Sequence, residues 1–437
     1  MLPIVAIVGR PNVGKSTLFN RVLGQRQAIV DELPGLTRDR HYAEASWNGR
    51  TFLLVDTGGI DPLSAQPIQR QIVRQTEYAI EEADLTLLVL DSKEGVTPLD
   101  LDVADRIRKR GRPALLVVNK VDTSRSEADL ADFYALGLGD PIPVSALHGR
   151  AAGDLLDLIV AVLPGAEPKP LDPNTIRIAV VGRPNVGKSS LVNRLTGQER
   201  MVVDEAPGTT RDAIDTTIRH GAQTYVLVDT AGMRREAKVH DPVEFYGITR
   251  ALRAISRADI VVLVVDVSRE PAKQEARLAA LAEERTKAIV VVFNKWDLVQ
   301  DPAASREAIE TEFTRMYPFL EHAPRLYASA KTGGGIARIL PACERVYREY
   351  ARLIPTPELN KAVHDILNRV RPPATPAGKH LKFYYAAQTS TKPPTFALYV
   401  NNPRYRIKNY VSYLERGLRE RFGFQGIPIV LDWKRSQ

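Results

Sequence analysis

Cysteine is almost absent from this 437-residue sequence, in which Cys343 is the only one. A single thiol cannot close an internal disulfide or build a cysteine-ligated metal cluster, so we interpret Cys343 as a buried helical residue. No apolar run approaches the roughly 18 residues that a membrane-spanning helix requires. A secretory signal is also missing, because Met1 leads directly into an apolar, strand-like run. These absences favour a globular protein of the reducing cytoplasm without stable membrane association.

Most of the chain also lacks an excess of charge of either sign. Residues 1–350 contain 45 Lys and Arg against 47 Asp and Glu, whereas residues 351–437 contain 15 against 5. The formal net charge of +8 therefore arises entirely in the last fifth of the chain. A basic excess confined to one region indicates a polyanionic partner for that region.

What the sequence does contain is a long internal duplication, which begins with an octapeptide that recurs 173 positions later. The two copies are Gly9-Arg10-Pro11-Asn12-Val13-Gly14-Lys15-Ser16 and Gly182-Arg183-Pro184-Asn185-Val186-Gly187-Lys188-Ser189. Each copy follows an apolar, strand-like run and precedes a helical pattern. Strand, glycine-rich loop and helix together form the context of a phosphate-binding loop, or P-loop.

The residues of this loop have a direct phosphate chemistry. Backbone N–H groups of the loop and of the helix N-terminus behind it would surround the α- and β-phosphates of a nucleotide. Lys15 and Lys188 would reach the β- and γ-phosphates, and the hydroxyls of Ser16 and Ser189 would bind Mg²⁺. Two identical octapeptides in identical contexts argue against a chance glycine turn.

Four further motif pairs continue the duplication along the chain. They are Pro34-Gly35-Leu36-Thr37-Arg38-Asp39 with Pro207-Gly208-Thr209-Thr210-Arg211-Asp212, Asp56-Thr57-Gly58-Gly59 with Asp229-Thr230-Ala231-Gly232, Asn119-Lys120-Val121-Asp122 with Asn294-Lys295-Trp296-Asp297, and Ser145-Ala146 with Ser329-Ala330. Such spacing describes a duplicated domain, because short solenoid repeats have periods of about 20–50 residues.

The two Asn-Lys-x-Asp tetrads indicate the base that is bound. A carboxylate such as Asp122 or Asp297 accepts two hydrogen bonds from the N1–H and N2–H groups of guanine, whereas adenine offers no such donor pair. The asparagines would hold the loop near the base, and the lysine stems would cover the ring. Ser145-Ala146 and Ser329-Ala330 would complete the base pocket through backbone contacts, with an ordinary loop as the alternative.

Further residues are candidates for the metal and the γ-phosphate. Asp56 and Asp229 follow predicted strands, where a carboxylate binds Mg²⁺ directly or through water. Gly59 and Gly232 would offer an N–H to the γ-phosphate and so sense its presence. Thr37 and Thr210 would close over Mg²⁺ from the other side, with turn caps after Pro-Gly as their alternative role.

The predicted elements divide the chain into domains. In each copy short apolar strands alternate with helices, which predicts a mainly parallel sheet covered on both faces, with the loops at the carboxyl ends of the strands forming the site. Four prolines in residues 164–173 indicate an extended linker. We therefore predict nucleotide-binding domains at residues 1–164 and 175–350, a linker at 165–174 and a C-terminal domain at 351–437. In the last, helix 357–370, strands 381–389 and 395–400, helix 405–421 and strand 427–431 give a small α+β fold.

With both motif sets in order over essentially all 437 residues, the chain resembles the Der/EngA family of bacterial GTPases. The resemblance implies an α/β protein with two tandem Ras-like P-loop G domains followed by an α+β KH-like domain. It also implies a monomeric enzyme that hydrolyses GTP to GDP with Mg²⁺ and times assembly of the large ribosomal subunit by binding that subunit and its rRNA, with no DNA partner.

The resemblance also raises the question of how water is activated. In related GTPases the residue after Asp-x-x-Gly is sometimes a glutamine that orients the attacking water, but here Ile60 and Met233 occupy those positions and cannot polarise it. The resemblance implies that K⁺, held partly by Asn12 and Asn185, replaces an arginine finger. The alternative is that these asparagines only stabilise their loops.

The C-terminal region departs from an ordinary KH module, because no Gly-x-x-Gly lies between its helices to clamp a nucleic-acid backbone. Basic residues alternate instead with aromatics, as in Lys382-Phe383-Tyr384-Tyr385 and in residues 404–410. Individual aromatics of this kind are more often core than stacking platforms, so we expect contact with folded rRNA through shape and charge.

Two other functions remain as alternatives. A GTPase of tRNA modification would need a further catalytic domain, for which no segment is long enough. A GTP-regulated scaffold or membrane-remodelling protein would need an amphipathic or apolar anchor, and the sequence shows none.

Overall fold

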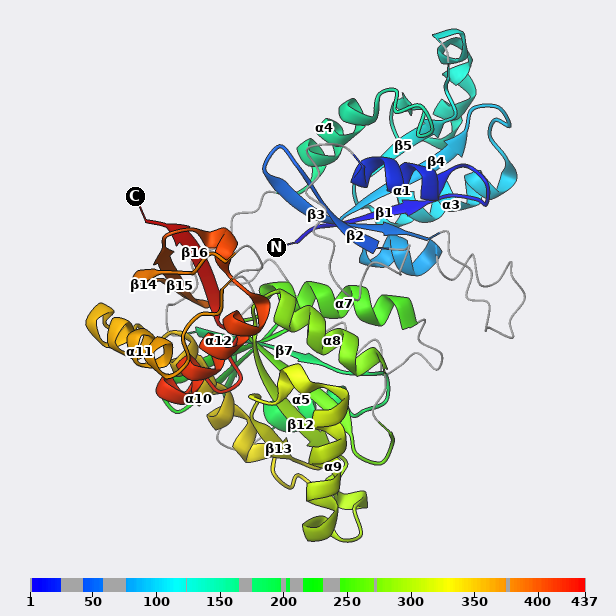
Figure 1. Cartoon of the computed structure of the whole chain (residues 1–437). Coiled ribbons are helices and arrows are strands. Elements are labelled where there is room, and N and C mark those ends of the chain that lie inside the picture. Colours follow the sequence, from blue (N-terminus) through cyan, green and yellow to red (C-terminus); the bar gives the residue numbers. More distant parts are fainter. Residues whose placement is uncertain are drawn as a thin grey trace. The chain divides into compact units, whose positions relative to one another are not determined.

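The computed structural model describes residues 2–24, 42–57, 76–122, 124–164, 175–197, 202–204, 215–230, 244–270, 273–374 and 378–436. The chain forms two compact units, Met1–Lys169 and Pro170–Gln437. The first unit holds one sheet and the second holds two (Figure 1). Each unit is described separately.

The first unit is built on a six-stranded sheet with the order β2-β3-β1-β4-β5-β6. Only the pairing of β2 with β3 is antiparallel. Its central strand β4 is buried at every position, as a parallel strand covered on both faces must be. The strands are β1 (Ile4–Val8), β2 (Tyr42–Trp47), β3 (Arg50–Asp56), β4 (Leu85–Asp91), β5 (Ala114–Asn119) and β6 (Pro141–Pro143).

Helices cover both faces of this sheet. Helices α1 (Lys15–Leu23) and α4 (Ala152–Val162) contact each other and share one core, and α3 (Pro98–Arg110) packs against β4. Helix α3 starts with a capping box between Thr97 and Asp100 and ends at Gly111, whose φ of 67° is readily adopted by glycine. The segment η1 (Ser124–Leu136) lies between β5 and β6.

The second unit begins with a seven-stranded sheet of order β13-β12-β11-β7-β10-β9-β8. Strand β9 pairs antiparallel with both β8 and β10, and the other pairings are parallel. The elements are β7 (Thr175–Val181), α5 (Lys188–Thr196), β8 (Val202–Asp204), β9 (Thr216–His220), β10 (Gln223–Val228), α7 (Glu244–Arg257), β11 (Ile260–Asp266), α8 (Lys273–Glu284), β12 (Ala288–Asn294), η2 (Trp296–Leu298), α9 (Pro302–Met316), η3 (Pro318–Leu320), β13 (Arg325–Tyr327), η4 (Ile336–Arg338) and α10 (Ile339–Tyr350).

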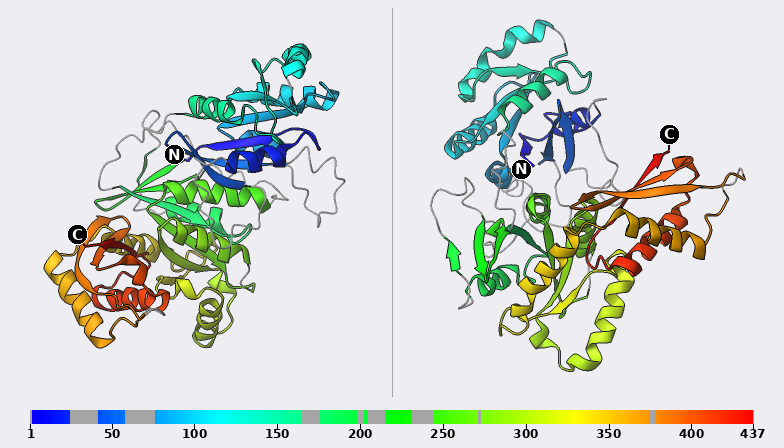
Figure 2. Two further views of the ribbon diagram at one scale, coloured as in Figure 1. Left: turned by 45° about the horizontal axis from the view of Figure 1, so that its top comes forward. Right: turned by 90° about the vertical axis from the view of Figure 1, so that its left-hand side faces the viewer.

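A small α+β domain completes the second unit. Its sheet has the order β14-β15-β16, with β14 antiparallel and β16 parallel to β15. Its helices α11 and α12 contact each other beside this sheet (Figure 2). The elements are α11 (Thr356–Arg369), β14 (Phe383–Thr391), β15 (Pro394–Val400), η5 (Pro403–Tyr405), α12 (Lys408–Phe422) and β16 (Val430–Arg435).

The predicted order α-β-β-α-β of this domain is confirmed, but the starts of two elements lie three residues from the prediction, and the other starts within two. The helix expected from Tyr405 begins at Lys408, after the short 3₁₀ segment η5. The strand expected at Ile427–Leu431 runs from Val430 to Arg435. Ile427, where the strand was expected to begin, is instead fully buried in the core shared with the preceding domain. Its carbonyl accepts a hydrogen bond from Arg419 Nη1 at 2.7 Å.

This domain and the preceding one share a continuous apolar core. One buried cluster runs from Val180 and Val262 in the large sheet through Tyr350 of α10 to Phe396 and Phe424 of the small domain. At the seam, Ile289 N–H donates to the carbonyl of Gly426 at 2.6 Å, and Gly426 N–H donates to that of His322 at 2.7 Å. The small domain is therefore held against one end of β12.

Candidate functional site

Each P-loop follows the first strand of its sheet along the chain. Its glycines are required because other atoms lie too close to leave room for a side chain. Gly14 and Gly187 have φ values of 93° and 98°, and a Cβ on either would lie 2.3 Å from the side-chain nitrogen of Asn119 or Asn294. A Cβ on Gly9 would lie 2.3 Å from a carbonyl oxygen, and one on Gly182 would lie 2.4 Å from one. Any side chain at these four positions would push the loop away from its sheet.

The loop asparagines and lysines take the same conformation in both copies. Asn12 and Asn185 are left-handed, with φ values of 67° and 63°. Lys15 Nζ donates to the carbonyls of Gly9 and Arg10 at 2.9 and 2.8 Å, and Lys188 Nζ makes the matching bonds with Gly182 and Arg183 at the same distances. Burial lowers the pKa of Lys15, against the attraction of the Asp56 carboxylate. Each ammonium group is thus held at the centre of its loop.

The candidate metal ligands meet in the first domain. Ser16 Oγ donates to Asp56 Oδ2 at 2.7 Å, and Asp56 is only 2% exposed at the end of β3. Thr57 is tied to β1, since its Oγ1 donates to the carbonyl of Ile7 at 2.9 Å. A hydroxyl and a carboxylate at this separation form a hard oxygen pair of the kind that Mg²⁺ prefers.

The equivalent aspartate of the second domain is arranged differently. Asp229 has a φ of 60°, and its N–H donates to Asp215 Oδ1 at 2.9 Å. Asp215 in turn pairs with Arg257 Nη2 at 2.5 Å. Thr230 Oγ1 lies 2.7 Å from Thr216 Oγ1. The duplicated sequence therefore has two local conformations at this position.

In each copy an asparagine of the tetrad links the P-loop to the loop that contains Ser145-Ala146 or Ser329-Ala330. We call this second loop the base loop. Asn119 Nδ2 donates to the carbonyl of Val13 at 2.8 Å, and Asn119 Oδ1 accepts from Ala146 N–H at 3.0 Å. Asn294 makes the same bonds with Val186 at 2.7 Å and Ala330 at 3.0 Å. Three predicted motifs, far apart in the sequence, thus converge at each site.

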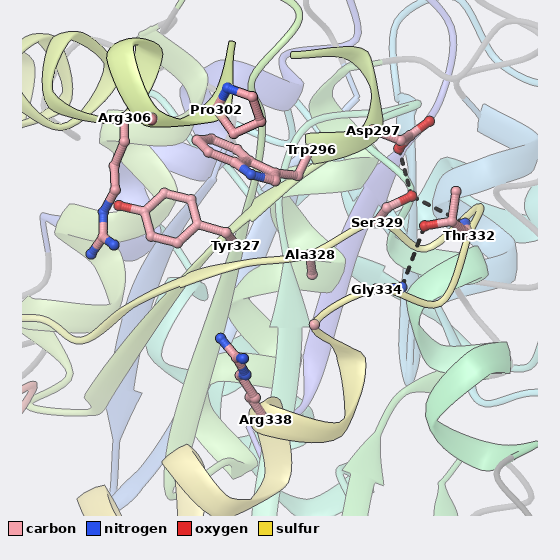
Figure 3. Close-up of a pocket in the computed structure, with 12 residues that line it drawn as sticks. Trp296, Asp297, Pro302, Arg306, Tyr327, Ala328, Ser329, Thr332, Gly334 and Arg338 are labelled. Carbon is pink, nitrogen blue, oxygen red and sulfur yellow. Dashed lines mark hydrogen bonds between the residues drawn. The ribbon is translucent and has the colours of Figure 1, made fainter. Parts of the chain in front are cut away.

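The aspartates expected to recognise guanine are oriented by the serines of the next loop. Ser145 Oγ donates to Asp122 Oδ1 at 2.9 Å, and Ser329 Oγ donates to Asp297 Oδ1 at 2.5 Å (Figure 3). The Ser145 bond and the nearby Lys93 ammonium hold the pKa of Asp122 below its usual range. A carboxylate fixed in its ionised form suits a partner that presents two N–H donors.

Sequence reasoning missed two aspartates that orient the tetrad lysines. Lys120 Nζ lies 2.6 Å from Asp91 Oδ2, and Lys295 Nζ lies 2.6 Å from Asp266 Oδ2. Burial alone would raise the pKa of Asp91, but its bonds to Lys120 and to Lys93 N–H lower it overall. Both aspartates end a buried strand and are 175 positions apart, the same separation as the two tetrads, so the repeat itself contained the signal.

Sequence reasoning also missed a pair of arginines that recur in the two copies. Arg21 Nε donates to the carbonyl of Ala146 at 2.8 Å, and Arg194 Nε donates to that of Ala330 at 3.3 Å. Each arginine lies on the helix that follows a P-loop, so each fastens the base loop to that helix.

The remaining octapeptide residues have structural contacts. Arg183 Nε donates to the fully buried Glu275 at 2.7 Å, and Arg10 pairs with Asp100 at 3.3 Å. Val13 and Val186 are buried, whereas Pro11 is exposed. Val121 is buried but its counterpart Trp296 is only half-buried. Several predicted residues, namely Thr37, Gly58, Gly59, Ile60, Thr210, Ala231, Gly232 and Met233, lie outside the described residues.

Comparison with known proteins matches this geometry to named families. The family described as "50S ribosome-binding GTPase" matches residues 4–120 and again 177–295. The family described as the C-terminal KH-domain-like part of EngA bacterial GTPases matches residues 353–434. The "GTPase Der" of Desulforudis audaxviator is 47% identical over 435 residues, covering 100% of this chain and 99% of the relative. The chain belongs to the Der family of GTPases.

A second relative gives the same result. The "GTPase Der" of Pelotomaculum thermopropionicum is 48% identical over 98% of this chain and 97% of its own length. Among solved structures, that of Era from Aquifex aeolicus is 23% identical, covers 58% of this chain and 87% of its own, and has a TM-score of 0.32. This Der-family chain is therefore a GTP-binding switch that hydrolyses GTP. Among its described residues, no helix is both long and apolar enough to cross a membrane.

Proposed function

We propose that this GTPase acts in maturation of the large ribosomal subunit, binds that subunit and its rRNA, and carries two Mg²⁺-dependent guanine-nucleotide sites. The observation that supports it best is the repeated frame in which Asn119 or Asn294 links a P-loop to a base loop. The family whose description reads "50S ribosome-binding GTPase" matches both domains that contain this frame.

The proposed chemistry divides the roles among the predicted residues. Lys15 and Lys188 turn from their loop carbonyls toward the β- and γ-phosphates, and the loop N–H groups bind the other phosphate oxygens. Ser16 with Asp56 and Ser189 with Asp229 hold Mg²⁺, with Thr37 and Thr210 closing over it. Mg²⁺ held there would neutralise negative charge on the phosphates. Asn12 and Asn185 additionally hold K⁺, and Gly59 and Gly232 contact the γ-phosphate.

RNA contact is proposed for the outer face of the three-stranded sheet. Tyr385 and Tyr399 lie directly opposite each other on β14 and β15, with their rings stacked at 4.1 Å and 11°. Lys434 of β16 is the next residue in the same row. The neighbouring row, Ala386, Leu398 and Trp433, faces the apolar core instead. A stacked pair of an exposed tyrosine, Tyr385, and a half-buried one, Tyr399, beside a lysine suits base stacking and phosphate contact.

Nucleotide state is proposed to reach this domain along β12. Asn294 at one end of β12 is bonded to the P-loop, and Ile289 near the other end is bonded to Gly426 of the KH-like domain. The strand is buried throughout, so a shift at either end is transmitted through close-packed neighbours. This connection makes subunit affinity depend on the nucleotide of the second site.

Co-sedimentation with purified large subunits tests the proposal. Affinity should differ between GDP, GTP and a non-hydrolysable GTP analogue, and should fall steeply with added salt because phosphate contacts release counterions. Equal binding in all nucleotide states would overturn the switch, and weak salt dependence would overturn the RNA contact. Pelleting with liposomes separates this proposal from a membrane-remodelling role.

A further inference from the structure

A pocket of about 600 Å³ lies beside the base loop of the second G domain. Its lining includes Trp296 and Asp297 of the tetrad, Tyr327 and Ala328 at the end of β13, and Arg306 and Arg338. Figure 3 shows the Trp296 indole and the Arg338 guanidinium on opposite sides of Ala328. The volume is within the range of roughly 300–1,000 Å³ that is usual for small-ligand sites.

This pocket adjoins the space in which guanine is proposed to bind, because Asp297 and Ser329 line it, but most of its other lining residues belong to neither the P-loop nor the tetrad. Ser329 Oγ donates to Asp297 Oδ1 at 2.5 Å and accepts from Thr332 N–H at 3.1 Å. These residues line the pocket on one side, where Figure 3 shows them, whereas Trp296, Tyr327 and Arg306 line the other. The tetrad lysine that would cover guanine, Lys295, is bonded to Asp266 and does not line the pocket.

The two walls suit a flat ring that carries negative charge. Trp296 is half-buried, and its ring centroid lies 4.4 Å from that of Tyr327, so the indole is held in place. Tyr327 is itself covered by the Arg306 guanidinium, 4.7 Å from its ring centroid. Arg338 is exposed, and within the described part of the chain its guanidinium forms no ion pair. An indole and such a guanidinium that line the same pocket offer a ligand a stacking surface for a planar base and a positive charge for a phosphate.

The first G domain provides an internal comparison, because other residues stand at four of the corresponding positions. Buried Val121 stands at the position of Trp296, and Pro143 at that of Tyr327. Ser145 N–H donates to the carbonyl of Arg150, and Ser329 N–H donates to that of Gly334, so Arg150 and Gly334 are equivalent positions. The first domain therefore has a long side chain where the pocket wall has a glycine. Asp154 stands at the position of Arg338. The two copies therefore share the nucleotide frame but differ at these four positions of the pocket lining.

We infer that the pocket between Trp296 and Arg338 binds a nucleotide other than the GTP of the adjacent site, namely an unpaired nucleotide of RNA whose base stacks on Trp296 and whose phosphate pairs with Arg338. The inference rests on the proposed RNA-binding function and names a contact outside the KH-like domain. A pyrimidine is the informative probe, because it cannot present the N1–H and N2–H pair of guanine to Asp297.

Tryptophan fluorescence of the full chain, measured in saturating GDP, tests the inference. Titration with a 5′-phosphorylated hexacytidylate RNA should change the Trp296 signal, whereas Trp296→Val, which installs the residue of the first domain, should abolish the change. Arg338→Gln should weaken binding of the oligonucleotide about tenfold, because it removes a charge-assisted phosphate contact. Arg345→Gln lies two turns further along the chain, on helix α10 and outside the pocket. It is the matched control and should bind as the wild type does.

The outcomes are distinguishable. Cytidine monophosphate that binds as tightly as the oligonucleotide would support the pocket and assign it to free nucleotides, which would overturn RNA as the source. No fluorescence change, or equal weakening by Arg338→Gln and Arg345→Gln, would overturn the site. Wild-type protein that still co-sediments with large subunits in that case leaves the proposed function intact.

Discussion

Asn294 and Val186 are joined by a hydrogen bond of 2.7 Å between the side-chain amide and the backbone carbonyl, although 108 positions separate them in sequence. Through this bond the loop that we propose reads the base is joined to the loop that we propose holds the phosphates. Asn119 and Val13 make the same bond at 2.8 Å in the first domain.

Replacement of this asparagine should weaken both folding and nucleotide binding. Asn294→Ala leaves the carbonyl of Val186 and the N–H of Ala330 buried without partners, which costs about 1–3 kcal/mol for each group. We expect a lower calorimetric unfolding temperature and weaker GDP binding at the second site. Asn119→Ala is the matched variant, with its effect confined to the first site. An unchanged affinity in both variants would contradict the role of the frame.

Base specificity should depend on the tetrad aspartates. Asp297→Asn replaces an acceptor pair with an amide that donates to the O2 of xanthine, so the second site should lose GDP and gain xanthosine diphosphate. Two hydrogen bonds to a carboxylate are involved, each about 1.5–3 kcal/mol, which predicts at least a hundredfold loss for GDP. Fluorescent analogues of both nucleotides measure the exchange, and Asp122→Asn tests the first site. Retained preference for guanine in both variants would refute the assignment.

Potassium should accelerate hydrolysis if Asn12 and Asn185 hold it. GTP turnover at equal ionic strength should be faster in KCl than in NaCl or choline chloride, because a cation beside the β- and γ-phosphates stabilises the charge that develops there. Asn12→Ala together with Asn185→Ala should remove most of the difference. Equal rates in the three salts would rule this cation out.

The seam between the second G domain and the KH-like domain should be sensitive to one methyl group. Gly426 has a φ of 70°, and a Cβ there would lie 2.5 Å from Ile289 O and 2.6 Å from Pro324 Cδ. Gly426→Ala should therefore destabilise the seam beyond the backbone strain of about 1 kcal/mol. Gly378→Ala is the matched control, since Gly378 has a φ of 71° and nothing within 4 Å. If the two variants have the same free energy of unfolding in chemical denaturant, the seam tolerates the methyl group.

Acid should weaken the same seam through His322, whose carbonyl accepts from Gly426. Burial and the nearby Arg419 cation lower the pKa of His322 from 6.5 to about 4. As pH falls through this window the unfolded chain takes up a proton that the folded chain does not, so stability is lost, by roughly 2–3 kcal/mol at most. Denaturant unfolding between pH 7 and 4 should show a smaller loss for His322→Gln. Parallel profiles of unfolding free energy against pH for the wild type and His322→Gln would contradict this role of His322.

Much of the fold could be predicted because its central strands are buried on both faces. Such strands appear as continuous apolar runs, and those expected at Leu85–Leu90 and Ala114–Val118 match β4 and β5 within one residue. The last strand was misplaced because Ile427 is apolar for another reason, its burial against the preceding domain. A single residue cannot reveal which of two apolar surroundings it occupies.

The aromatics of the KH-like domain illustrate the same limit. We expected most of them to be core, and Tyr410 is buried, whereas Tyr384 and Tyr385 are 50% and 45% exposed. A register shift between Phe383 and Tyr385 alters which face of β14 each ring occupies. The pocket beside Trp296 was equally invisible, because its two walls come from residues 42 positions apart whose meeting depends on the tertiary fold.

The proposed switch depends most on transmission from the second nucleotide site to the proposed ribosome-binding surface. Asp297→Asn protein allows that site to be loaded selectively with a xanthosine nucleotide while the first site holds GDP. Large-subunit affinity should then differ between xanthosine diphosphate and a non-hydrolysable xanthosine triphosphate analogue, and Gly426→Ala should reduce the difference. The same affinity with both nucleotides would contradict the proposed switch.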